Sequence, residues 1–296
     1  MNLNQLAIFH AVAQSGNLTR AAEVLCISQP AVSKQLRGLE KSLGTALFHR
    51  LSKGVQLTEA GHLLLEYSGR IFALETEAER ALAELRELQR GRLIIGASTT
   101  IGIYLLPEVM GAFQKLHPRI ELQLEIANTQ KIQHELAANK VDLALTEGIL
   151  EGDQWQSDAF QSDEIIAIAA KNCGLATKKN LAPKQICSER ILLREAGSGT
   201  RKVVENAFRE KAIPLESVMS LGSTEAIKRA VMNGMGIAFV SRLAVEDELK
   251  TGELVELIFS NWKIERDFYR LRLKGNYESR AAREFMRLLK QFCAAR

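Results

Sequence analysis

The spacing of apolar residues near the start of the chain predicts two short helices joined by a tight turn. Apolar positions recur close to a helical period on both sides of the polar pair Ser28-Gln29: Ala21, Ala22, Val24 and Leu25 before it, and Ala31, Val32, Leu36 and Leu39 after it. Ser28 suits the N-cap of the second helix, and Pro30 suits its first turn, where no backbone donor is needed.

The polar face of the second helix would present Gln29, Ser33, Lys34 and Arg37. Amide, hydroxyl, ammonium and guanidinium groups are the types that contact base edges and phosphates in DNA. The stretch from Asn17 to Leu43 therefore predicts a helix-turn-helix whose second helix enters a major groove. A helical hairpin in a small enzyme domain, with a solvated polar face, is the alternative.

The flanking segments fit the same interpretation. Residues 3–14 predict a first helix that covers the hairpin, with His10 packed rather than binding a metal. Two alternating segments, 47–50 and 54–57, predict a two-stranded wing around a Ser-Lys-Gly turn. Arg50 and Lys53 would lie near flanking phosphates, or in a solvated loop.

A heptad pattern of apolar residues begins at the end of the wing. The spacings alternate between three and four along Leu57, Ala60, Leu64, Tyr67, Ile71, Leu74, Ala78, Ala81, Leu85 and Leu88. A second copy of the same helix is the simplest partner for this seam, and packing on the chain's own C-terminal domain is the alternative. Two copies of the DNA-binding helix presented together predict an operator with an inverted repeat. The heptad pattern does not distinguish a dimer from a tetramer.

Beyond Gly91, short apolar runs alternate with amphipathic segments of about ten residues, the pattern of an α/β domain with parallel strands. The expected strands are 92–97, 120–126, 141–145, 164–170, 191–193 and 236–240, and the expected helices are 104–116, 130–139, 201–211, 225–233 and 243–249. About 200 residues of this pattern predict two small α/β lobes, with ligands at the carboxyl ends of the strands.

Four junctions between an expected strand and the next helix are rich in hydroxyl groups and glycine. They contain Ser98, Thr99 and Thr100; Thr146 and Glu147; Arg194, Ser198, Gly199, Thr200 and Arg201; and Thr224. Free backbone N–H groups, hydroxyls and two arginines would hold a small anion. Simple helix capping is the alternative at each junction.

Composition and charge narrow the class of protein. Residues 1–57 carry six Lys or Arg against two Glu, a net charge of +4, while residues 58–90 carry four Arg against seven Glu, a net charge of −3. The positive charge is thus densest at the predicted DNA-binding segment. The four cysteines lack metal or disulfide spacing, no catalytic motif occurs, and no leader or membrane span is recognised, so we expect a cytoplasmic protein that is not an enzyme and has no cofactor.

The N-terminal block AIFHAVAQSGNLTRAAEVLCISQPAVSKQLRGLEKSLGTALFHR, followed by LTEAG, closely resembles the LysR-type transcriptional regulators. STTIG, TEG, REAGSGTR and GSTEAIKRAV resemble the branch that regulates carbon fixation and sulfur assimilation. The resemblance implies a winged helix-turn-helix over residues 1–57, a dimerising linker helix over 58–90, and an effector-binding domain over 91–296 that is similar to periplasmic binding proteins. Its lobes would be about 92–161 with 268–296, and about 162–267.

By position, the resemblance implies DNA contacts from Gln29, Pro30, Ser33, Lys34, Arg37 and Arg50, and effector contacts from the junction residues named above. It implies double-stranded operator DNA as a partner, a homodimer that assembles into a homotetramer, and an effector that alters DNA bending, with RNA polymerase a candidate partner. The effector would be a small inorganic oxyanion or a phosphorylated or nucleotide-like metabolite. An exported solute receptor and a transferase on the same scaffold are the competing classes.

Overall fold

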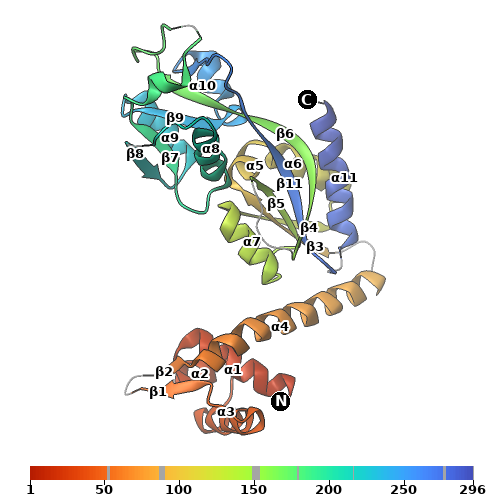
Figure 1. The fold of residues 1–296 in the computed structure, drawn as a ribbon. Coiled ribbons are helices and arrows are strands. Elements are labelled where there is room, and N and C mark those ends of the chain that lie inside the picture. Colours follow the sequence, from red (N-terminus) through yellow and green to blue (C-terminus); the bar gives the residue numbers. More distant parts are fainter. Residues whose placement is uncertain are drawn as a thin grey trace. The chain divides into compact units, whose positions relative to one another are not determined.

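The protein divides into two compact units, Met1–Leu82 and Ala83–Arg296 (Figure 1). The structure is a computed structural model, and it describes residues 1–51, 54–86, 91–148, 154–178, 180–215, 217–275 and 278–295. Each unit has its own hydrophobic core, and each is described separately below.

The N-terminal unit is a winged helix-turn-helix, which confirms the predicted fold. Its elements are the helices α1 (Leu3–Ser15), α2 (Leu18–Val24), α3 (Gln29–Leu43) and α4 (Glu59–Arg86), with the wing strands β1 (Phe48–Arg50) and β2 (Val55–Leu57). Asn17 caps α2 by accepting hydrogen bonds from the N–H groups of Thr19 (2.8 Å) and Arg20 (3.3 Å). The periodic apolar positions of all three short helices meet in one core around the fully buried Phe9.

The predicted heptad seam of α4 lies partly against the core of the N-terminal unit and partly on the exposed surface of the helix. Ala60, Leu64 and Ile71 pack against the core of the N-terminal unit, so this part of the seam is used within the chain. Tyr67 and Leu74 are 50% and 62% exposed and leave an apolar strip on the helix surface. The side chains of Ala81 and Leu85, and the whole of Leu88, lie outside the described residues.

The C-terminal unit is built on one mixed sheet in which nine described strands are joined. The strand order is β4-β3-β5-β11-β6-β9-β7-β8, and β10 pairs separately with β6. The bounds are β3 (Gly91–Ser98), β4 (Ile120–Ala127), β5 (Leu143–Glu147), β6 (Trp155–Ala170), β7 (Ile191–Arg194), β8 (Val218–Leu221), β9 (Ile237–Ser241), β10 (Leu254–Leu257) and β11 (Ile264–Leu273).

Two long antiparallel strands, β6 and β11, run through the whole C-terminal unit and connect its halves (Figure 1). We call lobe I the half that contains β3, β4 and β5, and lobe II the half that contains β7, β8, β9 and β10. The apolar cores separate along the two long strands, since Phe160 and Phe268 belong to the lobe I core whereas Ile165 and Ile264 belong to the lobe II core.

Each lobe is a sheet covered by helices on both faces, as the alternating pattern predicts. In lobe I, α5 (Thr99–Tyr104), α6 (Leu106–Leu116) and α11 (Arg280–Ala295) pack on one core cluster, and α7 (Thr129–Ala137) packs on another. In lobe II, α8 (Gly199–Glu210) and α9 (Thr224–Met232) supply residues to separate clusters, and α10 (Glu246–Thr251) supplies Leu249 to the α9 cluster. Short 3-10 helices are η1 (Pro183–Ile186) and η2 (Arg242–Ala244).

The six expected strands are all present as β3, β4, β5, β6, β7 and β9, and the expected fold class is confirmed. The apolar pattern did not predict β8, β10, β11 or α11. The missed β11 is rich in charge, IERDFYRLRL, because Arg266 and Arg270 form ion pairs with Asp163 and Asp158 of β6. The expected helix 243–249 is divided into η2 and α10 at Val245.

Candidate functional site

The predicted DNA-contacting residues lie on the surface of α3. The Ser28 side chain caps this helix by accepting from the N–H of Ala31 (3.4 Å), and Val32, Leu36 and Leu39 turn into the core. On the remaining surface, Gln29, Pro30, Lys34 and Arg37 are exposed and Ser33 is half-buried. The Arg37 Nε donates to the Ser33 carbonyl (3.3 Å), which directs the guanidinium along the helix surface.

The wing is attached to the helices by backbone contacts. Glu40 of α3 accepts through Oε1 from the N–H of Leu47 (2.8 Å), at the start of the wing. Gly54 has a φ of +87°, and a Cβ there would lie 2.5 Å from the carbonyl oxygen of Gly16, so the turn requires glycine. Arg50 ends β1, but its side chain is outside the described residues, as are Ser52 and Lys53.

The four predicted hydroxyl-rich junctions do meet between lobe I and lobe II. The buried ends of β3 and β5 contribute Ser98, Thr146 and Glu147 from adjacent parallel strands. Each of these residues has a buried oxygen atom without a hydrogen-bond partner among the described residues: Ser98 Oγ, Thr146 Oγ1 and Glu147 Oε2. Such unpartnered buried atoms are uncommon in native proteins and call for an explanation.

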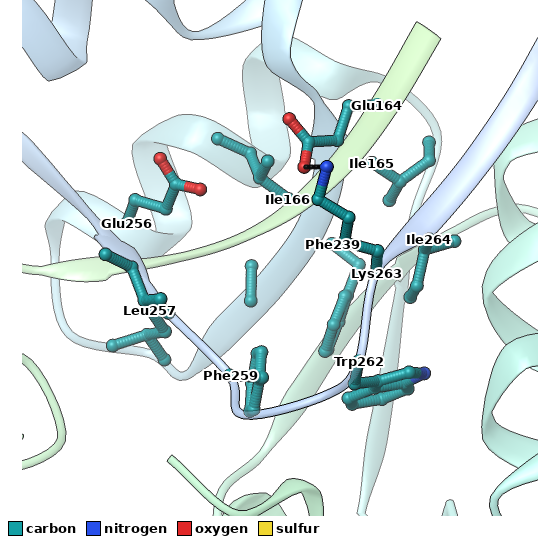
Figure 2. A pocket seen from close by; sticks show the side chains of 12 residues that line it. Glu164, Ile165, Ile166, Phe239, Glu256, Leu257, Phe259, Trp262, Lys263 and Ile264 are labelled. Atoms are coloured by element: carbon teal, nitrogen blue, oxygen red, sulfur yellow. Dashed lines mark ion pairs between the residues drawn. The ribbon is translucent and has the colours of Figure 1, made fainter. Parts of the chain in front are cut away.

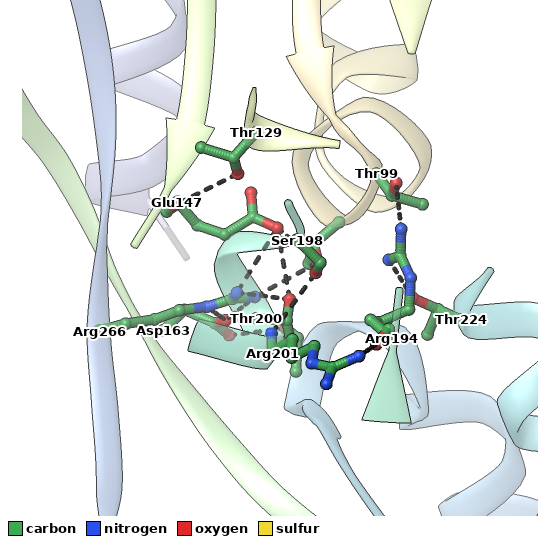
Figure 3. Close-up of polar contacts among 12 residues, drawn as sticks. Thr99, Thr129, Glu147, Asp163, Arg194, Ser198, Thr200, Arg201, Thr224 and Arg266 are labelled. Carbon is green, nitrogen blue, oxygen red and sulfur yellow. Dashed lines mark hydrogen bonds and ion pairs between the residues drawn. The ribbon is translucent and has the colours of Figure 1, made fainter. Parts of the chain in front are cut away.

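Arg266 of β11 is a buried arginine that forms hydrogen bonds with several residues between the lobes (Figure 3). Its Nε and Nη2 both donate to Asp163 Oδ2 of β6, at 2.8 and 2.7 Å. Nη1 donates to Thr200 Oγ1 (2.8 Å), and Nη2 donates to Thr100 Oγ1 (3.3 Å). Arg266 therefore joins hydroxyl groups from both lobes.

Glu147 lies beside the same guanidinium, with its Oε1 3.5 Å from Arg266 Nη1. The hydroxyls of Thr100 and Thr200 donate to this oxygen at 3.5 and 3.4 Å. Burial disfavours the charged carboxylate and raises the pKa of Glu147 above its usual value, although Arg266 and Arg194 act in the opposite direction.

A second buried arginine, Arg194 at the end of β7, also bridges the lobes. Its Nη2 donates to Thr99 Oγ1 of lobe I, and its Nη1 donates to Thr224 Oγ1 of lobe II, both at 3.1 Å. Its Nε and Nη2 also donate to the two carboxylate oxygens of Glu195, at 2.8 and 2.9 Å. Burial opposes ionisation of Glu195, but the hydrogen bonds from Arg194 are strong enough to lower its pKa.

The start of α8 packs directly on the end of β5. Ser198 caps α8 by accepting from the N–H of Arg201 (3.4 Å). A Cβ on Gly199 would lie 2.1 Å from the Glu147 carbonyl oxygen, so only glycine permits this approach. Arg201 does not face Arg194 across the site as a pair of clamps: its Nε contacts Glu205 (2.7 Å), and its Nη1 donates to the Arg194 carbonyl (3.2 Å).

Sequence reasoning missed several residues of this site. Asp163 lies beside Glu164 and Arg266 lies between Glu265 and Asp267 within long strands, so their charge alone did not single them out. Ser241 supports them by donating to Asp163 Oδ1 (2.7 Å). Glu195 immediately follows the predicted Arg194, which was the one local signal available. Asn128, the N-cap of α7, donates to Glu195 Oε1 (3.3 Å) from lobe I.

An apolar cavity of lobe II is separate from these residues. It has a volume of about 230 Å³, and its walls include Phe239, Phe259 and Trp262 (Figure 2). Glu164 and Lys263 lie at its edge and form an ion pair at 4.0 Å. None of the predicted effector residues lines it. In the described part of the chain, no group of three or more His, Cys, Asp or Glu is arranged to hold a metal ion.

Comparisons with known proteins agree with this architecture. Residues 3–62 match the profile "Bacterial regulatory helix-turn-helix protein, lysR family", and residues 86–294 match "LysR substrate binding domain". The chain belongs to the LysR family and is a DNA-binding transcriptional regulator with an effector-binding domain. The members of this family are transcriptional regulators, which are not enzymes. Among the described residues, no helix is both long and apolar enough to span a bilayer.

The RuBisCO operon transcriptional regulator of Allochromatium vinosum is 36% identical over 285 residues, which cover 96% of this chain and 94% of that protein. This similarity confirms the predicted resemblance to carbon fixation regulators. The CcmR regulatory domain of Synechocystis PCC6803, solved in complex with 2-PG, is 31% identical with a TM-score of 0.63, and covers 69% of this chain and 98% of its own. Full-length CbnR with its target DNA, at 20% identity and a TM-score of 0.69, covers 98% and 99% and shares the fold.

Proposed function

We propose that a small anionic effector binds between lobe I and lobe II and changes how copies of this regulator are arranged on operator DNA. The effector site contains the predicted residues Ser98, Thr99, Thr100, Thr146, Glu147, Arg194, Ser198, Gly199, Thr200 and Thr224, together with Arg266. The predicted Arg201 is left out of it, because its guanidinium contacts Glu205 and the Arg194 carbonyl. The DNA-contacting residues are Gln29, Pro30, Ser33, Lys34, Arg37 and Arg50.

The observation that carries the effector site is the set of unpartnered buried oxygens on Ser98, Thr146 and Glu147. A buried polar atom without a partner lowers the stability of the protein, and a ligand that bonds to it recovers that free energy. Because the buried cations Arg194 and Arg266 each donate to hydroxyl groups from both lobes, the favoured ligand between the lobes carries negative charge.

A phosphorylated metabolite fits this site better than a small inorganic oxyanion. The groups that would contact the ligand extend from Arg194 to Glu147, so several acceptor atoms in one molecule would satisfy more of them. The threonine and serine hydroxyls of the site would donate to several oxygens of one phosphate group. The complex of the related CcmR domain with 2-PG supports this choice and makes 2-PG the first compound to test. A nucleotide-like coinducer is the alternative.

The effector would act by shifting an equilibrium that exists without it. Groups from both lobes contact Arg194 and Arg266, so a ligand there favours one relative position of the lobes, by as much as its affinities for the two positions differ. The exposed apolar strip of α4 supports a homodimer, and a homotetramer would form from two of them. In the complete assembly, two α3 helices would read an inverted repeat, and RNA polymerase is a candidate further partner.

Thermal unfolding in the presence of 2-PG, phosphate or sulfate tests the effector site. Thr100→Ala and Ser198→Ala remove one hydroxyl each, and we expect both to abolish the ligand-dependent rise in Tm while operator binding is retained. Thr177→Ala, which removes an exposed hydroxyl in lobe II, is the matched control and should keep the full rise. If the rise survived in both Thr100→Ala and Ser198→Ala, the site would lie elsewhere.

A further inference from the structure

The Glu195 carboxylate binds the Arg194 guanidinium with the same two-bond geometry that the anionic group of a ligand would adopt. Its two carboxylate oxygens accept from Nε and Nη2 at 2.8 and 2.9 Å, which is the parallel, two-bond geometry by which a guanidinium binds carboxylates and phosphates. The remaining hydrogen bonds of Arg194 connect it to Thr99 and Thr224, so four of its five N–H donors are engaged.

We propose that Glu195 is an internal competitor of the effector: its carboxylate holds Arg194 in the effector-free protein, and the effector's anionic group displaces it. This inference rests on the proposed effector site and adds to it the residue that sets affinity and selects for charge. Displacement exchanges one set of hydrogen bonds on Arg194 for another and involves no covalent step.

The two partners differ in how readily each can leave. The Arg194 side chain is 4% exposed, whereas that of Glu195 is 29% exposed and already reaches water. A carboxylate that rotates outward is solvated at once, but the guanidinium that it leaves stays buried and requires another negative charge. Only an anion can therefore replace Glu195 without leaving an uncompensated buried cation.

Glu195 also contributes to the contacts between the lobes. Asn128 of lobe I donates to its Oε1 at 3.3 Å, and the adjacent backbone of Gln130 donates to the Gly197 carbonyl at 3.2 Å. Gly197 has a φ of +86°, a conformation that favours glycine, within the short turn that carries Glu195. Displacement of the carboxylate would break the Asn128 contact, so effector binding and the lobe contact are coupled.

A purely structural ion pair is the competing explanation, in which Glu195 stays on Arg194 and the effector contacts other groups. The two explanations predict opposite effects for Glu195→Gln. Removing a competitor raises affinity for the anion, whereas removing a counter-ion that supports the site lowers affinity or leaves it unchanged.

The experiment titrates the full-length protein with 2-PG, and separately with inorganic phosphate, by calorimetry. We expect Glu195→Gln to lower the dissociation constant for the anion at least about tenfold, and Arg194→Gln added to it to remove the gain. Glu205→Gln is the matched control, since Glu205 pairs with the neighbouring Arg201 at 2.7 Å and not with Arg194. It should change the dissociation constant less than about twofold. Glu195→Ala is the second variant if Glu195→Gln does not unfold cooperatively.

Equal or weaker binding by the Glu195 variants than by the wild type would overturn the competitor role while leaving the effector site intact. If the Glu195 variants bound phosphate in a manner that requires Arg194, but neither they nor the wild type bound 2-PG, the competitor role would stand and 2-PG would be excluded as the natural effector. If no variant bound either anion, both the competitor role and the anionic effector site would be wrong.

Discussion

The exposed face of α3, where we propose that DNA binds, and the proposed effector site between the lobes both contain arginine, yet they are built in opposite ways. On α3, Lys34 and Arg37 stand on one helix and are exposed. Between the lobes, Arg194 and Arg266 are buried, and each already contacts a carboxylate and hydroxyls from distant segments. DNA is a large, solvated polyanion that approaches a surface, whereas a small ligand must be enclosed.

This difference determines what each arginine does for the protein. An exposed arginine can be removed with little effect on folding, because water solvates it in both the folded and the unfolded state. A buried arginine compensates a buried carboxylate, and its loss leaves that charge without a partner. Substitution of an arginine on α3 should therefore change DNA binding without changing stability. Substitution of a buried arginine between the lobes should change both ligand binding and stability.

Arg266→Gln should have the largest effect. It leaves Asp163 buried without its ion-pair partner, so we expect the free energy of unfolding of the C-terminal unit to fall by about 3–5 kcal/mol. Urea unfolding followed by circular dichroism measures this. Arg287→Gln is the control, because Arg287 is 59% exposed and pairs with Glu284 on the surface, where the change should stay within about 0.5 kcal/mol. Equal stability of the two variants would show that burial does not distinguish these arginines.

Arg37→Ala should have the next largest effect, on DNA binding alone. Loss of one base-reading or phosphate-binding arginine typically costs about 1–3 kcal/mol, so operator affinity should fall about 5- to 150-fold while the unfolding curve is unchanged. Gel-shift titration at several salt concentrations measures it. Arg37→Lys is the matched variant that keeps the charge and loses the planar, two-bond donor, and it should retain non-specific binding better than operator binding. Unchanged operator affinity in Arg37→Ala would remove Arg37 from the reading face.

Glu147→Gln should have the smallest effect, and it should depend on pH. Because the folded-state pKa of Glu147 is raised, the folded protein binds a proton more tightly than the unfolded chain, and stability falls as pH rises above the ordinary glutamate value of 4.5. The glutamine variant resembles the neutral form and lacks this fall. The Tm of Glu147→Gln should therefore rise relative to wild type as the pH is raised above 4.5. A difference in Tm that stayed constant with pH would contradict a raised pKa.

The sequence alone was enough to place the polar residues of α3 on one face, but it did not show how the residues between the lobes contact one another. Gln29, Ser33, Lys34 and Arg37 lie within nine consecutive positions, so a helical period was enough to place them on one face. Thr99, Arg194 and Thr224 could be found individually because each lies at a strand-to-helix junction. Nothing in the sequence indicated that Arg194 would donate to both threonine hydroxyls, which are separated from it by 95 and 30 residues.

Local order in this protein follows from short-range physics that can be recognised in the chain itself. Caps such as Asn17 and Ser28, the apolar period of α3 and the alternation of strands and helices after Gly91 each depend on neighbours a few residues apart. The ion pair between Asp163 and Arg266 depends on the antiparallel pairing of β6 with β11, which brings together positions 103 residues apart. Burial there, and the competition that we assign to Glu195, arise only when the two lobes enclose these charges, because desolvation is a property of the whole fold.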